Sequence, residues 1–148
     1  MINKQLYLVV EMEQRKEDRM AADYGKAKND LAEHEIRSQA LQEHKKQYMQ
    51  DVLDQGKKGL GIQQMNRFHV FIGKLDQACS VQSNKVQTAK KVVEQRRALW
   101  LNQQRKRKAI QSVIDKQKQA EQLAEQRAEQ KMFDEFAMQQ YFRKTQAN

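Results

Sequence analysis

Apolar side chains recur along this chain at alternating steps of four and three residues. Between Leu6 and Val52 this stepping meets fourteen positions, nine of them apolar, and between Phe68 and Ile114 it meets fourteen more, ten of them apolar. A seam with a mean period of 3.5 residues is typical of helices that supercoil around each other. The pattern therefore predicts two long amphipathic helices and argues against a disordered chain.

The two seams are separated by a glycine-rich break, which contains Gly56, Gly59 and Gly61. Glycine ends helices because it enters left-handed backbone conformations at little steric cost. We expect a first helix over about 3–55, a hinge over about 56–62 and a second helix over about 63–144, within a single coiled-coil domain over 1–148. Because a short connection returns the second helix beside the first, the predicted fold is all-α, a long two-helix antiparallel coiled coil or helical hairpin.

The second helix is longer than the first can cover. Folding the chain about residue 59 puts Leu6 level with roughly residue 112, so the second helix should continue for roughly 30 residues, or about 45 Å, as a C-terminal overhang. The overhang contains KMFDEFAMQQYFRK at 131–144, with four of the ten aromatic residues of the chain. One face of this stretch consists of Met132, Phe133, Phe136, Ala137 and Gln140. Such a face is either a surface for a partner protein, which we favour, or a frayed end or self-association patch.

Composition agrees with long helices and not with a compact core. Charged residues make up 32% of the chain, proline is absent and the mean hydropathy is -1.02. Cys79 is the only cysteine, so no intramolecular disulfide forms and a reducing compartment is expected. The apolar run 6–10 is too short for a signal peptide or a membrane-spanning helix. These features predict a soluble, cytoplasmic protein.

Charge is distributed unevenly along the chain. Residues 1–55 carry 9 Lys/Arg and 11 Asp/Glu, a net of -2, and residues 56–148 carry 19 and 8, a net of +11, which together give the overall +9. In a hairpin the acidic first helix faces the basic second helix, although exposed ion pairs contribute only about 0–1 kcal/mol each. The basic stretch QRRALWLNQQRKRKA at 95–109 spreads its charges around the helix, which favours a solvated or internally paired surface over a protein-partner or nucleic-acid-binding surface.

The sequence contains no recognisable catalytic constellation. His34, His44 and His69 have no cysteine or carboxylate at metal-ligand spacing. The hinge stretch GKKGLGI lacks both the GK[ST] ending and the preceding strand of a phosphate-binding loop. Cys79 falls on the seam and is interpreted as a buried core thiol. We therefore expect no enzyme activity, no metal and no cofactor.

Five features together resemble a known family: the length of the chain, the acidic first helix, the glycine hinge before residue 62, FIGKLDQA at 71–78, and above all KMFDEFA at 131–137 followed by an RK tail. Over essentially the full chain they resemble the flagellar export protein FliJ of bacterial type III export systems. The resemblance implies a non-catalytic stalk or adaptor similar to the γ subunit of rotary ATPases, cytoplasmic and peripheral to the inner membrane. The implied partners are the export ATPase hexamer, whose ring assembly it promotes, the cytoplasmic domain of the export gate, and export chaperones, with no nucleic acid.

The resemblance also implies where the partners bind. The gate-binding surface falls on Phe71, Leu75 and Ala78 of FIGKLDQA and, by their offset before the hinge, on Leu41 and Tyr48. Because Leu41, Tyr48 and Leu75 are also seam positions, Phe71 and Ala78 are the better candidates. The terminal end of the stalk enters the ATPase ring, and the expected ring-contacting residues are Met132, Phe133, Phe136, Ala137 and Gln140.

Two other functions stay open from the sequence. One is a generic coiled-coil spacer or homodimeric rod, and the other is a basic nucleic-acid-binding helical protein. Sedimentation distinguishes the first, and salt-dependent retention on RNA or DNA distinguishes the second.

Overall fold

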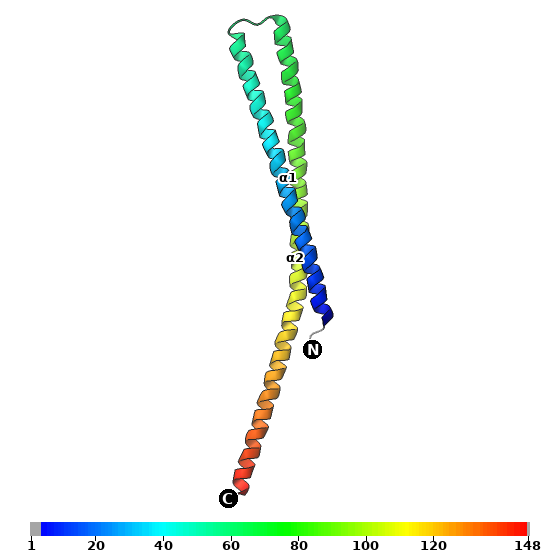
Figure 1. Cartoon of the computed structure of the whole chain (residues 1–148), viewed down its shortest axis with the longest axis vertical. Helices are drawn as coiled ribbons and strands as arrows, with labels where there is room; N and C mark the ends of the chain where they lie inside the picture. Colours follow the sequence, from blue (N-terminus) through cyan, green and yellow to red (C-terminus); the bar gives the residue numbers. More distant parts are fainter. Residues whose placement is uncertain (1–3, 148) are drawn as a thin grey trace. The chain divides into compact units, whose positions relative to one another are not determined.

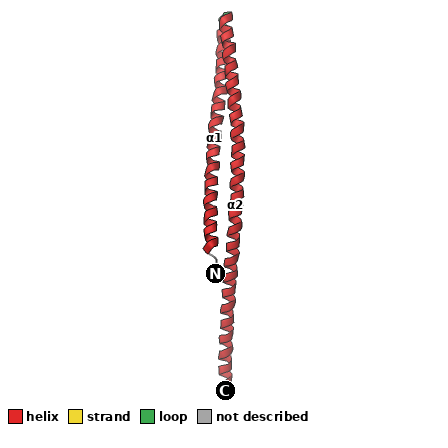
Figure 2. Ribbon diagram, turned by 90° about the vertical axis from the view of Figure 1, so that its right-hand side faces the viewer, coloured by secondary structure: helices red, strands yellow, loops and turns green. Residues whose placement is uncertain are grey.

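A computed structural model describes residues 4–147, and these residues form two helices (Figure 1). Helix α1 runs over Lys4–Gly56 and helix α2 over Ile62–Gln146. Among the described residues only 57–61 and 147 are not helical, and no strand occurs (Figure 2). The ranges expected from the sequence were 3–55 and 63–144, of which residue 3 lies outside the described residues.

Residues 57–61 connect the two helices, and the backbone conformation of Gly59 determines the path of the chain there. Gly59 has a φ of 89°, in the left-handed region that costs other residues about 1–2 kcal/mol. Its N–H donates a hydrogen bond of 3.2 Å to the backbone C=O of Gly56, the last residue of α1. The backbone C=O of Gly61 accepts a bond of 3.1 Å from the N–H of Met65. Gly61 is therefore the N-terminal cap of α2.

Packing contacts divide the chain into two compact units. The turn unit consists of Asp18–Asn102, and the terminal unit consists of Met1–Glu17 and Gln103–Asn148. In the turn unit, the α1 and α2 segments lie side by side and run in opposite directions from the connection at 57–61 (Figure 1). The turn unit is thus a helical hairpin.

Aromatic side chains pack the two helices of the turn unit together. The rings of Tyr24 and Trp100 are stacked, with centroids 5.6 Å apart. Closer to the connection, the centroid of the Tyr48 ring lies 5.6 Å from that of Phe68 and 4.5 Å from that of Phe71. Aromatic pairs at these separations contribute about 0.5–1.5 kcal/mol beyond the burial of their area. Four of these residues are seam positions, and Phe71 lies beside the seam.

The terminal unit has a covered part and an uncovered part. Ile114 is its most deeply buried residue, with 0% of its surface exposed. The Lys118 ammonium lies 5.4 Å from the centre of the Tyr7 ring, which links α2 to the beginning of α1. Beyond the half-buried Glu121, every residue over 122–147 is exposed, although α2 stays helical to Gln146. We call residues 122–147 the exposed end.

The predicted seam forms the core of both units. All fourteen of its positions on α1 are buried or half-buried, and so are all of its positions on α2 except Arg96. Arg96 is exposed because burying a guanidinium without an ion-pair partner is costly. The prediction of an all-α, two-helix antiparallel coiled coil with a C-terminal overhang is confirmed.

Candidate partner-binding surfaces

The exposed end of α2 carries apolar side chains that nothing within its unit covers. All five predicted ring-contacting residues lie there: Met132, Phe133, Phe136, Ala137 and Gln140. Phe133 is 73% exposed and Phe136 is 60% exposed. Additional exposed apolar residues occur on other sides of the same turns, namely Met138, Tyr141 and Phe142. An exposed cluster of large apolar side chains is typical of protein–protein interaction sites, so residues 132–142 are a candidate partner-binding surface.

The last turn of α2 is stabilised by its own side chains. The hydroxyl of Thr145 donates to the backbone C=O of Phe142 at 2.9 Å and lies 3.1 Å from that of Tyr141. Arg143 and Lys144 place positive charge at the negative end of the helix dipole, which is favourable. The apolar face is therefore followed by a helix end with favourable charges and side-chain hydrogen bonds.

Phe71 lies at the edge of the core of the turn unit. Its ring contacts Tyr48, but 39% of the residue is exposed. A groove of about 330 Å³ lies beside it, and its lining consists of Asn66, Arg67, Val70, Phe71 and Lys74. The Phe71 side chain is thus held in place by Tyr48 and accessible to a partner from the groove.

The other predicted gate-binding residues differ in burial. Leu75 is buried, with 7% of its surface exposed, while Ala78, Leu41 and Tyr48 are half-buried. The hairpin brings Tyr48 and Phe71 into contact but places Leu75 in the core. Phe71 is therefore the most accessible of the five residues, and Leu75 is the least accessible.

Polar pairs occupy part of the core of the terminal unit. The side-chain amide of Gln103 donates to the carboxylate of Glu13 at 2.5 Å and to its backbone C=O at 3.1 Å. The hydrogen bond from Gln103 holds the pKa of Glu13 below its ordinary value, helped by Lys16 and Lys106 and opposed by burial. The Arg107 guanidinium bonds the buried Glu17 carboxylate at 2.5 Å. The predicted pairing of an acidic first helix with a basic second helix is confirmed at these positions.

Almost the whole chain matches one known protein family. The model of the family described as flagellar FliJ protein matches residues 3–146 of the 148-residue chain. The chain belongs to the flagellar FliJ family. No curated protein and no solved structure matches it. Membership of the FliJ family makes the protein a component of the flagellar export apparatus, in a family that is non-catalytic.

Membrane-spanning helices, metal sites and the environment of Cys79 were also considered in the sequence of this FliJ family member. Within residues 4–147, neither helix combines the length and the apolar character needed to cross a membrane. In the same range, no three His, Cys, Asp or Glu side chains are grouped so that they could hold a metal ion. Cys79, expected to be a buried thiol, is half-buried and lines a shallow groove with Lys45 and Met49.

The basic stretch 95–109 of this FliJ family member is engaged within the coiled coil at several points. Trp100 stacks on Tyr24, and the Lys28 ammonium lies 4.4 Å from the centre of the same Tyr24 ring. Arg107 bonds Glu17, as described above. These contacts favour the interpretation of this stretch as solvated or internally paired.

Sequence reasoning missed three residues that line the groove beside Phe71: Arg67, Val70 and Lys74. Arg67 and Val70 precede FIGKLDQA, and Lys74 lies within it but was not among the residues assigned to the gate surface. Arg67 lies four residues before Phe71 and Lys74 lies three residues after it, which places both on the same side of the helix as Phe71, and this spacing could have identified them. The groove adds two positive charges to the candidate gate-binding surface.

Proposed function

We propose that this FliJ family protein is a non-catalytic stalk and adaptor of the flagellar export apparatus. In this proposal it binds the export ATPase and promotes assembly of its hexamer, couples the hexamer to the cytoplasmic domain of the export gate, and associates with export chaperones. It acts on the cytoplasmic side, peripheral to the inner membrane. The observation that carries the proposal is the exposed end of α2, which is helical, is uncovered within its unit and carries six exposed large apolar side chains over 132–142.

Binding of the ATPase ring accounts for the aromatic residues of the exposed end. Full burial of a Phe side chain contributes about 1.5–3 kcal/mol. A ring that encloses Phe133 and Phe136 gains that contribution from each, and neither side chain loses existing contacts because both are exposed. The favourable burial of apolar surface is then available to drive assembly of the ring around the helix.

Binding of the export gate is assigned to the surface around Phe71. The exposed part of the Phe71 ring supplies an apolar anchor, and Arg67 and Lys74 supply positive charge beside it. Ala78 and the accessible parts of Leu41 and Tyr48 extend the surface, and the buried Leu75 supports it. The gate surface lies in the turn unit and the ring surface in the terminal unit, so the two partners have separate binding sites on one chain.

The ATPase part of the proposal is tested with the purified full chain and the cognate export ATPase. Addition of the wild-type chain should increase the hexamer fraction, measured by light scattering, and the rate of ATP turnover. The double variant Phe133→Ser/Phe136→Ser should weaken association by more than about tenfold, since about 1.4 kcal/mol corresponds to a factor of ten. The matched control is Ile36→Ser, which removes an exposed aliphatic group of α1. Folded wild-type protein that changes neither hexamer fraction nor turnover would refute this part.

The gate part is tested with the purified cytoplasmic domain of the gate. Phe71→Ala should weaken binding, measured by titration calorimetry, while Val113→Ala, an exposed valine of the same helix outside the gate surface, should have no effect on binding. The melting temperature of each variant is measured as well, because loss of the contact between Phe71 and Tyr48 would lower the stability of the chain. A variant that binds weakly but melts like the wild type has lost a contact with the gate itself. Normal gate binding by a folded Phe71→Ala protein would show that Phe71 serves packing alone.

Association with chaperones is tested by gel filtration of the chain with each purified export chaperone. A shift of both proteins to a common, earlier peak is expected for at least one chaperone. If every chaperone elutes separately at micromolar concentrations, the chaperone part of the proposal is removed without affecting the other two parts.

A further inference from the structure

Two glutamines of α2 bind α1 in the same way, one in each unit. In the turn unit, the side-chain amide nitrogen of Gln82 lies 3.0 Å from the backbone C=O of His34 and 3.2 Å from Nδ1 of its ring. In the terminal unit, the amide nitrogen of Gln103 lies 3.1 Å from the backbone C=O of Glu13 and 2.5 Å from its carboxylate. We call the first arrangement the turn clamp and the second the terminal clamp.

The two clamps obey the same register between the helices. From Gln82 to Gln103 there are 21 residues along α2, and from Glu13 to His34 there are 21 residues along α1. This separation is three heptads on both helices, and the heptad is the repeat of a coiled coil. The two glutamines are therefore equivalent positions, and the clamps differ only in the α1 side chain that accepts the second hydrogen bond.

The contacts of Gln82 determine where the His34 ring carries its proton. A backbone C=O only accepts hydrogen bonds, so the amide atom of Gln82 that contacts it is the nitrogen. The second hydrogen of the same nitrogen is available to Nδ1 of the ring. Nδ1 is then an acceptor and carries no proton. The turn clamp therefore requires a neutral His34 ring with its proton on Nε2.

A proton on Nδ1 of His34 breaks the turn clamp. The Nδ1–H group and the amide N–H of Gln82 would face each other as two donors. Rotation of the amide by half a turn would bring its oxygen against the backbone C=O of His34, so neither orientation satisfies both contacts. Gln82 is only 7% exposed and His34 is half-buried, so the lost hydrogen bond is poorly replaced by water and its loss is costly.

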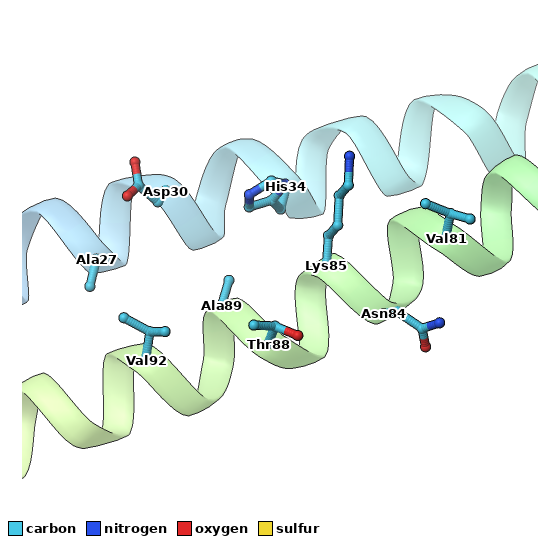
Figure 3. A pocket seen from close by; sticks show the side chains of 9 residues that line it. All are labelled: Ala27, Asp30, His34, Val81, Asn84, Lys85, Thr88, Ala89 and Val92. Carbon is cyan, nitrogen blue, oxygen red and sulfur yellow. The ribbon is translucent and has the colours of Figure 1, made fainter.

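The charged groups around His34 act on its proton in opposite directions. Asp30 of α1 and Lys85 of α2 line the same groove as His34 (Figure 3). The Asp30 carboxylate favours a charged ring, whereas the Lys85 ammonium opposes it. The other titratable residues within four positions of His34 or Gln82 do not line this groove: Glu33, Glu35, Arg37 and Cys79. With both signs of charge in the groove, the contact with Gln82 is what separates the neutral ring from the charged one.

We infer that the turn clamp is an acid-sensitive switch, which holds α1 and α2 together while His34 is neutral and opens when the ring gains a proton. Histidine is the side chain that changes charge between about pH 5 and 8. The terminal clamp opens only under stronger acid, because its acceptor is a carboxylate and the hydrogen bond from Gln103 lowers the pKa of Glu13. Mild acid therefore releases the clamp of the turn unit and leaves that of the terminal unit closed.

The first test measures the tautomer of His34 in the full chain with ¹⁵N-labelled histidine at about pH 8. Long-range proton–nitrogen correlation spectra show which ring nitrogen carries the proton, and His34→Gln assigns the signal. His44 and His69 are exposed and serve as internal references. The fraction with the proton on Nε2 should be higher for His34 than for the two reference residues.

The second test reverses the response to acid with Gln82→Glu. A carboxylate at this position accepts from a protonated His34 ring but faces two other acceptors when the ring is neutral. Lowering the pH from about 8 to about 5.5 should therefore raise the melting temperature of this variant relative to the wild type by about 2–4 °C. The matched control, Gln87→Glu, adds the same charge at an exposed position of α2, and its melting temperature should change in parallel with that of the wild type.

The third test measures the coupling within each clamp by a double-mutant cycle. His34→Ala, Gln82→Ala and the double variant should show a coupling at about pH 8 that falls to less than about half at pH 5.5, because histidine gains its proton in this range. The corresponding cycle of Glu13→Ala and Gln103→Ala should give the same coupling at both pH values, because Glu13 stays ionised.

Three outcomes would overturn the inference. The first is an equal tautomer fraction for all three histidines. The second is a Gln82→Glu variant whose melting temperature changes with pH as that of Gln87→Glu does. The third is a coupling between His34 and Gln82 that is the same at both pH values. Neither the ATPase nor the gate takes part in these measurements, so their failure leaves the proposed function untouched.

Discussion

Gln103 of α2 donates two hydrogen bonds to Glu13 of α1, one to the carboxylate and one to the backbone carbonyl. Both residues are buried, and Lys106 lies 3.7 Å from the same carboxylate. A shift of α2 along α1 would leave a carboxylate in the core without its amide partner, which is costly. The pair therefore favours one register between the helices in the terminal unit.

The lowered pKa of Glu13 predicts a pH-dependent contribution to stability. A carboxyl group whose pKa is lower in the folded chain stabilises the fold above its unfolded pKa, about 4.3 for Glu. That contribution is lost as the pH falls through the lower, folded pKa. We expect Glu13→Gln to melt below wild type at pH 7, and the difference to shrink under strongly acidic conditions. Melting curves recorded by circular dichroism over this pH range measure the difference between the two proteins. A difference that does not change with pH would contradict a lowered pKa of Glu13.

Ile114 and Val113 provide a neighbouring pair for testing the core of the terminal unit. Ile114 is fully buried, whereas Val113 is 46% exposed. Truncation of a buried Ile to Ala typically costs about 2–5 kcal/mol because it leaves a cavity. We expect Ile114→Ala to lower the unfolding free energy within that range, and Val113→Ala to lower it by less than about 1 kcal/mol. Chemical unfolding compares the two, and equal losses would place the core elsewhere.

Two glycines of the turn unit should respond to the same substitution in opposite ways. Gly59 has a φ of 89°, so Gly59→Ala should destabilise the hairpin by about 1–2 kcal/mol. Gly73 lies inside α2 with open space around its Cα, so Gly73→Ala should stabilise the helix by about 0.5–1 kcal/mol. Denaturant unfolding gives both values. Changes of the same sign would show that the connection is not held in the left-handed conformation.

Removal of residues 131–148 should separate folding from binding. Because residues 131–147 are exposed, their loss should change the melting temperature by less than about 2 °C, a shift that corresponds to less than 1 kcal/mol in a chain of this size. The same truncation should weaken association with the export ATPase, measured by gel filtration and turnover. A large fall in melting temperature would instead mean that the segment packs against its own coiled coil.

The residues of the candidate gate surface were predicted from the sequence, but their accessibility could not be. FIGKLDQA located Phe71, Leu75 and Ala78 by resemblance, and the seam assigned Leu75 to the core, where the structure places it. The period of the seam could not reveal that Phe71 packs on Tyr48 and still exposes 39% of its surface. The exposure of Phe71 depends on which side chain of α1 lies opposite it, and that residue is far away in the sequence.

The sequence by itself determined the two helices, the position of the break between them and the length of the uncovered end. These follow from the local period of apolar residues, from the conformational freedom of glycine, and from the difference in length between the two segments. Only the tertiary structure decided that Gln103 meets Glu13, and that Gln82 meets His34. Those relationships depend on the register between helices, which joins residues far apart in the chain and which no local pattern encodes.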